Sequence, residues 1–225
     1  MKIQTLTLLT NHLNEMKNFY HHTLDFDLVH DEAHSFSVQI GASLLVFKKT
    51  EDPVEPFYHF AMNIPQNLMK EAKAWLNSII TLNTHYGEDE VFFENWNAHA
   101  IYFTDPAGNI VELIARHDDQ IPDGHLPFNS KLIMNISEIG IVTNQVQPMV
   151  QKILSKGLKE ARPGSEYFAP LGDVEGLFIV VKNKRIWFFS DKPAAFFPVH
   201  VIVENIGQFT FYQVNEVLFK EISQI

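Results

Sequence analysis

The 225-residue sequence contains no cysteine. Disulfides, thiolate nucleophiles and sulfur-ligated metals are therefore excluded, and any bound metal must be held by His, Asp or Glu. Basic residues are also few, because 17 Lys and Arg stand against 27 Asp and Glu, which gives a net charge of −10. This charge would repel a phosphate backbone, so we expect no nucleic-acid partner.

Long apolar runs are missing as well. No segment approaches the length needed to span a bilayer, and the first nine residues are too polar for a signal peptide. We therefore expect a cytoplasmic protein with no membrane partner. The sequence does have ample material for a core, since 46% of its residues are hydrophobic and 19 of them are Phe. These Phe side chains are expected in cores or in the wall of an aromatic cavity.

A short apolar strand ending in Thr-Asn occurs twice, at residues 5–11 and 138–144, and a helical spacing of apolar residues follows each copy. Two further strands of this character begin near residues 58 and 199. Strand-then-helix thus starts four times, near residues 3, 57, 136 and 199. In the fourth copy the predicted helix contains Phe209, Tyr212, Val214, Val217, Leu218 and Ile222.

Stretches typical of β-strands lie between these starts. They are residues 27–30, 35–40, 43–49, 91–94, 99–104, 109–116, 167–169, 176–182 and 186–190. The predicted unit is βαβββ, repeated, which places the chain in the α+β class with curved mixed sheets and a truncated second pair of modules. The sequence predicts one domain over residues 1–117, a polar linker with Pro and Gly over 118–131, and a diverged second domain over 132–225.

The run Phe-Thr-Asp-Pro-Ala-Gly-Asn-Ile-Val-Glu-Leu at 103–113 combines a tight turn with an apolar strand. Phe19-Tyr20 and Leu24-Asp25-Phe26 follow the first strand. In this order of elements, the segments resemble the vicinal oxygen chelate superfamily of glyoxalases, bleomycin-resistance proteins and extradiol dioxygenases. The resemblance covers residues 1–117 and rests on the repeat alone from 132 onward. It implies paired modules that curl into half-barrels.

The resemblance also implies a divalent metal inside the half-barrel, held by the first strands of both modules and the last strand of the second. The matching positions are His59, Glu112 and Thr5. Thr5 is a poor metal ligand, and we predict it as a ligand-binding residue. Glu112 alternates with Ile110 and Ile114, so its carboxylate shares an apolar face and needs a metal or a partner. We predict Glu112 as a catalytic and metal-binding residue and His59 as a metal ligand; a structural histidine and a paired glutamate are the alternatives.

The hairpin suggests a further ligand. If strands 99–104 and 109–114 pair across the Asp-Pro-Ala-Gly turn, Ile101 lies opposite Glu112 and His99 is its diagonal neighbour. His99 would then complete a set of two histidines and one carboxylate, and Phe103 on the same face would contact the ligand. A slip of one residue would turn His99 outward.

The first strands of the third and fourth modules place Glu138 and His200 at matching positions. They could face each other as ligand-binding residues, an acid and a base or two metal ligands. The alternative is an inactive, diverged copy.

Three functions remain open. The first is a lyase, isomerase or ring-cleaving dioxygenase that uses Fe, Mn, Ni or Zn on a small oxygenated molecule. The second is a metal-free binding protein of the bleomycin-resistance kind, with an aromatic cup for a planar small molecule. The cup wall could include Phe36, Phe47, Phe60, Tyr102 and Phe103. The third is an inactive, oligomeric protein. We expect a homodimer in each case, because the truncated module leaves a free sheet edge. Such a fold does not by itself determine the reaction.

Overall fold

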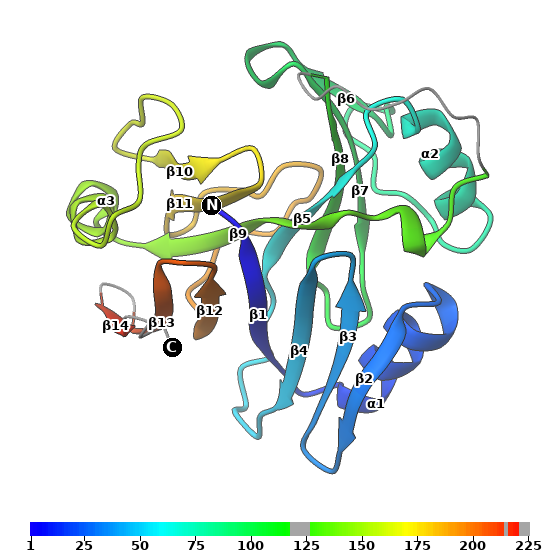
Figure 1. Ribbon diagram of the computed structural model, residues 1–225, viewed down its shortest axis with the longest axis horizontal. Helices are drawn as coiled ribbons and strands as arrows, with labels where there is room; N and C mark the ends of the chain where they lie inside the picture. The colour runs from blue at the N-terminus through cyan, green and yellow to red at the C-terminus, as the bar shows by residue number, and fades with distance from the viewer. Residues whose placement is uncertain (118–126, 214–215, 221–225) are drawn as a thin grey trace.

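The computed structural model describes residues 1–117, 127–213 and 216–220. Their strands form two seven-stranded mixed sheets (Figure 1). The first sheet has the order β14-β13-β12-β1-β4-β3-β2 and the second β10-β11-β9-β5-β8-β7-β6. The first consists of β1 (Ile3–Thr10), β2 (Asp27–Glu32), β3 (Ser35–Ile40), β4 (Ser43–Lys49), β12 (Val199–Val203), β13 (Gly207–Gln213) and β14 (Glu216–Lys220). The second consists of β5 (His59–Ile64), β6 (Val91–Phe93), β7 (Ala98–Thr104), β8 (Ile110–Arg116), β9 (Asn135–Thr143), β10 (Phe168–Asp173) and β11 (Gly176–Lys182).

The helices are few and short, as expected for the predicted α+β class. They are α1 (Leu13–Lys17), which continues into a π-helical turn η1 (Asn18–Thr23), α2 (Met69–Asn77), α3 (Val146–Leu154) and the 3₁₀ turns η2 (Glu94–Trp96) and η3 (Ser130–Leu132). In α2, Met69, Ala72 and Leu76 are buried at the spacing of one helical face. No helix within the described ranges is both long and apolar enough to cross a membrane.

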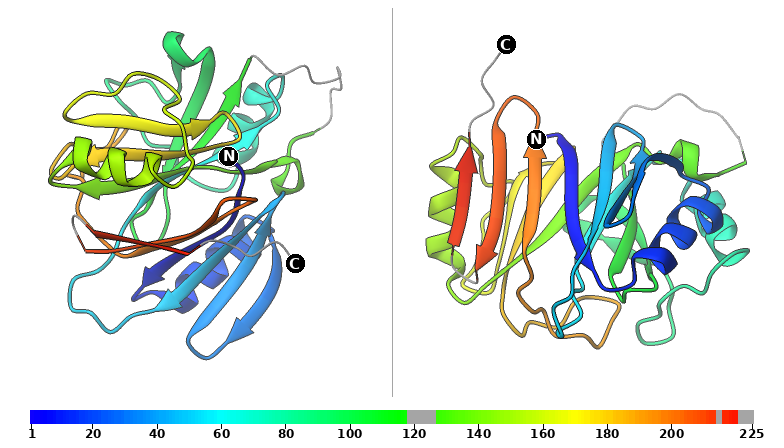
Figure 2. Two further views of the ribbon diagram at one scale, coloured as in Figure 1. Left: turned by 60° about the vertical axis from the view of Figure 1, so that its left-hand side comes forward. Right: turned by 90° about the horizontal axis from the view of Figure 1, so that it is seen from below.

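One apolar core fills the space between the two sheets, which lie as facing layers in Figure 2. On β1 buried apolar residues such as Leu6 and Leu8 alternate with more exposed ones. The central strands of the second sheet, β5 and β8, are instead buried along their whole length because both of their faces are covered. The opposite face of the second sheet carries a separate apolar cluster that includes Ala61, Tyr102, Ile179 and Trp187. This outer cluster surrounds the candidate site.

The modules pair across the predicted linker. In the first sheet β1 pairs antiparallel with β12, and in the second β5 pairs antiparallel with β9. The first module therefore joins the fourth, and the second joins the third. Neither 1–117 nor 132–225 carries a sheet of its own, so the predicted domain division does not follow the sheets. Most of the predicted linker, residues 118–126, lies outside the described residues.

The predicted helix after residue 203 is wrong, because β13 and β14 occupy that part of the chain. Phe209 and Phe211 are fully buried, and their ring centroids lie 5.2 and 5.5 Å from that of Phe178. These two phenylalanines flank Thr210, which is only partly buried. The two-residue period of a strand thus overrides the helical spacing that also fits the apolar residues. Val214 and Ile222, which belonged to the predicted helix, lie outside the described residues.

The strand predicted at 186–190 is also absent. Residues 183–198 form a loop in which only one isolated bridge, between Ile186 and Pro193, has strand pairing. Lys184 and Phe189 adopt left-handed backbone conformations, with φ of 70° and 53°, and such residues interrupt an extended strand. This segment, which we call the 183–198 loop, contributes to the cavity described next.

Candidate metal centre

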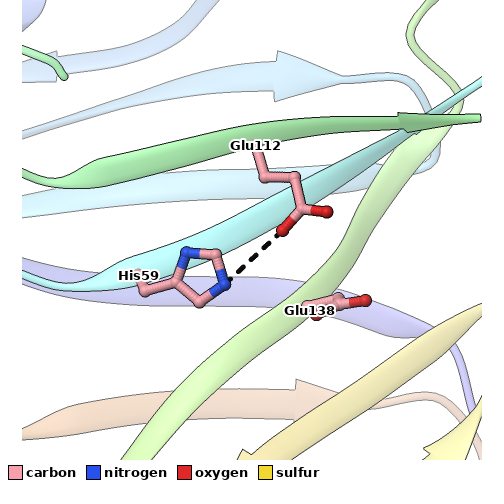
Figure 3. A group of neighbouring side chains, drawn as sticks. All are labelled: His59, Glu112 and Glu138. Atoms are coloured by element: carbon pink, nitrogen blue, oxygen red, sulfur yellow. Dashed lines mark ion pairs between the residues drawn. The ribbon is translucent and has the colours of Figure 1, made fainter. Parts of the chain in front are cut away.

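Three ionisable side chains converge on the outer face of the second sheet (Figure 3). β5 lies between β8 and β9, and its residue Ala61 is opposite both Glu112 and Glu138. His59 is two residues from Ala61 and so projects from the same face. The small side chain of Ala61 leaves the space between the two glutamates open. Each of the three residues offers a ligand atom, and these atoms lie within 4.8 Å of one another.

The imidazole of His59 is held in one orientation. A carbonyl oxygen can only accept a hydrogen bond, so Nδ1–H donates to the backbone oxygen of Ile110 at 3.1 Å. Nε2 is then left facing Glu112 Oε2 at 3.6 Å. Burial lowers the pKa of His59, which favours a neutral ring with a free lone pair on Nε2. Metal-binding histidines share this arrangement, in which the second ring nitrogen is fixed by a backbone or carboxylate acceptor.

Glu112 carries an electrostatic cost. It is 3% exposed, and burial together with the neighbouring Glu138 raises its pKa well above the ordinary value. A hydrogen bond from Tyr102 and the charge of Arg116 act in the opposite direction but are weaker. Two carboxylates at close range in a poorly solvated site resist simultaneous ionisation. A cation bound between them would remove that resistance.

Glu138 is oriented by a buried arginine. Nη2 of Arg116, at the end of β8, forms an ion pair with Oε1 of Glu138. Nε of Arg116 donates to Asn63 Oδ1 at 3.3 Å. The Asn63 amide in turn donates to the backbone oxygen of Val174 at 2.9 Å. This chain of hydrogen bonds holds Arg116 in place, and Arg116 in turn orients the carboxylate of Glu138.

The β9–β11 pair repeats the geometry of the β5–β8 pair without a fourth ligand. Gly140 on β9 is opposite Ile179 on β11, just as Ala61 is opposite Glu112. Ile179 therefore occupies the position that corresponds to Glu112. The donor set is one imidazole nitrogen and two carboxylates, a set that suits Fe, Mn, Ni or Zn.

A cavity of about 290 Å³ opens above these three residues. Its walls are largely aromatic and comprise Phe93, Trp96, Tyr102, Phe168, Trp187 and Phe188. The Trp187 ring centroid lies 4.9 Å from that of His59. Gly140 permits this approach, because a Cβ there would lie 2.5 Å from the indole. The 183–198 loop thus covers the candidate ligands with apolar surface.

The structure places His59 beside Glu112, as expected for two residues that match ligand positions of one metal site in the superfamily. Glu138 joins them, whereas its expected partner His200 lies in the first sheet. There His200 Nδ1 is 2.8 Å from Thr210 Oγ1. Thr5 also lies in the first sheet, opposite Ile202. Neither Thr5 nor His200 lines the cavity above Glu112.

The β7–β8 hairpin differs by one residue from the expected register. Tyr102, not Ile101, is opposite Glu112. His99 pairs with Ala115 and so projects from the other face, where its Nδ1 lies 2.7 Å from His117 Nε2. The placement of His99 beside Glu112 is therefore wrong, for the reason that a one-residue slip reverses every side chain.

The same slip places Phe103 opposite Val111, in the core between the sheets. Phe36, Phe47 and Phe60, which were expected in the cup wall, also belong to that core. Of the expected aromatic wall residues, Tyr102 lines the cavity. Sequence reasoning missed Arg116, although its alternation with Glu112 and Ile114 was a usable signal.

No protein-family model matches the sequence, and no curated protein matches it. Solved structures do. A putative dioxygenase from Bacillus subtilis subsp. subtilis str. 168 is similar with a TM-score of 0.57 at 14% identity, over 97% of this chain and 69% of that chain. Glyoxalase I from Zea mays is similar with a TM-score of 0.53 at 14% identity, over 80% of this chain and 66% of that chain. The chain has the fold of these glyoxalase and dioxygenase structures, which confirms the fold implied by the sequence resemblance.

Proposed function

We propose that the protein is a divalent-metal-dependent enzyme that acts on a small oxygenated molecule in the aromatic cavity. His59, Glu112 and Glu138 would hold the metal. The observation that carries this proposal is the convergence of a neutral imidazole and two buried carboxylates within 4.8 Å. Arg116 already pairs with Glu138, but within the described residues no Lys or Arg forms an ion pair with Glu112. Ionising this second buried carboxylate is therefore expensive, and a divalent ion would offset that cost.

The donor atoms fit a metal after a small contraction. Ligand atoms about 2.1 Å from a common ion lie about 3 Å apart. The ligand atoms of the three residues now lie up to 4.8 Å apart, so they must move toward one another when the metal binds. A set of three protein ligands leaves coordination positions open for other oxygen atoms. Ile179 supports this, because an apolar side chain stands where a fourth ligand would be.

A bound metal would polarise the oxygens of a substrate as a Lewis acid. The chain's own residues bind and orient the rest of the molecule. Burial keeps the pKa of the Tyr102 phenol well above its ordinary value, so this hydroxyl stays protonated and donates its one hydrogen bond to Glu112. Trp187 and Phe188 restrict the access of water. In catalysis we propose that Glu112 is a metal ligand. It also accepts the hydrogen bond donated by the Tyr102 hydroxyl.

Metal content tests the proposal. The protein would be purified without a His tag and without chelators, incubated with Mn, Fe, Ni or Zn salts, desalted and analysed for bound metal. We expect close to one ion per chain in the wild type and large losses in His59→Ala and Glu112→Gln. His99→Ala is the matched control and should keep its metal, because His99 lies on the opposite face of the sheet.

No bound metal in the wild type with any of the four ions would contradict the proposal. A metal-free small-molecule binding protein would then be the better account. Arg116 favours that second function, because its ion pair with Glu138 already offsets one of the two buried carboxylates. We also propose that the protein is a homodimer located in the cytoplasm.

A further inference from the structure

The cavity contains a second feature that the metal centre does not use. Arg185, in the 183–198 loop, lines the same cavity as Glu112 while its side chain remains partly open to solvent. Its Nη1 donates to the backbone oxygen of Ile186 at 3.4 Å, and its guanidinium lies 5.4 Å from the ring centroid of Phe168. No Asp or Glu in the described part of the chain forms an ion pair with Arg185. Most of its donors are thus available to a ligand.

The two other arginines nearby are already engaged. Arg116 is buried and bound to Glu138. Arg162 stacks on the ring of Trp96 at 4.6 Å and does not line this cavity. Arg185 is therefore the cation that an anionic ligand in the cavity would meet.

The charges of the cavity also determine how such a ligand lies. Without a metal, Glu112 and Glu138 would repel an anionic group placed beside them. With the proposed divalent ion bound, the ion and the two carboxylates would together carry no net charge. Arg185, the cationic residue of the lining, would attract the same group. The body of the ligand would then contact the aromatic walls, which favour a flat ring over a flexible chain. A volume of about 290 Å³ lies at the lower end of ligand pockets and suits one substituted ring.

We propose that Arg185 binds the carboxylate of a planar aromatic acid whose ring lies between the aromatic walls and whose opposite end points to His59, Glu112 and Glu138. This inference rests on the proposed function in that it takes the cavity as the substrate site. It goes further by naming the class of substrate and the residue that selects it. A guanidinium recognises a carboxylate through two parallel hydrogen bonds, which a neutral amide cannot accept in the same way.

Benzoate and its neutral counterpart benzamide test this selectivity. Binding of each would be followed by quenching of tryptophan fluorescence, since Trp96 and Trp187 line the cavity. Titrations would use the wild type, Arg185→Gln, Arg185→Lys and Arg162→Gln, each with and without prior removal of metal by a chelator. Near-ultraviolet circular dichroism would verify that the variants are folded.

We expect benzoate to bind the wild type about tenfold to a hundredfold more tightly than benzamide, the range of a charge-assisted hydrogen bond. Arg185→Gln should abolish this preference, and Arg185→Lys should keep part of it. Arg162→Gln should retain all of it, because that arginine lies outside the cavity. Acetate, which lacks a ring, should bind at least about tenfold more weakly than benzoate.

Equal binding of benzoate and benzamide to the wild type would overturn the inference. A preference for benzoate that survives in Arg185→Gln would also overturn it. If this surviving preference is seen only when metal is bound, the benzoate carboxylate binds the metal and not Arg185. The proposed function fails separately, by the absence of bound metal. A preference that depends on Arg185 in chelator-treated protein would support the inference even then.

Discussion

The two sheets share one plan, yet only the second gathers charged groups at its centre. In the second sheet Ala61 lies between Glu112 and Glu138. In the first sheet Thr7 occupies the matching place, and its neighbours on the two sides are Val46 and His200. The residues that correspond to His59, Glu112 and Glu138 are thus Thr5, Val46 and His200. None of these three is a carboxylate.

The covering of the two faces differs as well. Thr5, Val46 and His200 are each partly exposed, whereas the three candidate ligands in the second sheet are buried. The difference shows that the strand framework alone does not make a site. A candidate site of this kind also needs ionisable side chains at neighbouring positions on adjacent strands. It further needs apolar residues that bury those side chains.

The largest effect is expected where the two sheets are joined. Tyr20, which follows the first strand, donates its hydroxyl to Asp105 Oδ2 at 2.9 Å, in the turn between β7 and β8. Burial raises the pKa of Asp105 from 3.8 to about 6. The protonated form is therefore favoured by the folded state. Its stabilisation is fully present below about pH 4 and is lost as the pH rises through about 6.

We predict that this group lowers the free energy of unfolding by up to about 3 kcal/mol between pH 4 and pH 7. Urea denaturation at a series of pH values would measure it. Asp105→Asn cannot ionise and should show a flatter dependence over this range. The same pH slope in wild type and variant would rule out Asp105 as the linked group.

A smaller effect on the free energy of unfolding is expected where Trp187 of the 183–198 loop packs on the second sheet. Gly140→Ala places a methyl group 2.5 Å from the indole of Trp187, so the indole must shift. We predict a loss of about 1–3 kcal/mol in unfolding free energy and an altered tryptophan fluorescence spectrum. Combining Gly140→Ala with Trp187→Ala should cost less than the sum of the two single changes. Additive costs would indicate that the two residues do not press on each other.

The smallest effect is expected in the first sheet. His200→Ala removes the hydrogen bond to Thr210, so we predict a loss of about 0.5–1.5 kcal/mol. Metal content should not change, because His200 is in the other sheet. A fall in bound metal would contradict the assignment of the metal centre to the second sheet alone, and would indicate that His200 is a ligand.

The periodicity of the sequence was sufficient for most individual strands. The bounds of β3, β4 and β11 agree with the predicted ranges, because short runs of apolar and β-branched residues end at clear turn residues there. The sequence resemblance selected His59 and Glu112 as candidate ligands, and the structure places them side by side. Their contact also follows from β5 and β8 being parallel neighbours.

Long-range pairing and register could not be predicted in the same way. The repeat shows that the modules are alike, but it carries no information on which module pairs with which. Glu138 could therefore be assigned to His200 as readily as to His59. The hairpin register depends on one residue in the turn, and that single residue decided whether Ile101 or Tyr102 faces Glu112. The 183–198 loop holds Trp187 through contacts from β9 and β5, which no local pattern reveals.

Glu138 offers the most direct test, because it reaches His59 and Glu112 only through the pairing of the second and third modules. Mn²⁺ would be titrated calorimetrically into chelator-treated wild type, Glu138→Gln and, as a control, Glu160→Gln, which replaces an exposed glutamate. We predict about one site per chain in the wild type and in Glu160→Gln, and at least about tenfold weaker binding in folded Glu138→Gln. Wild-type affinity in Glu138→Gln would contradict a metal centre shared by His59, Glu112 and Glu138.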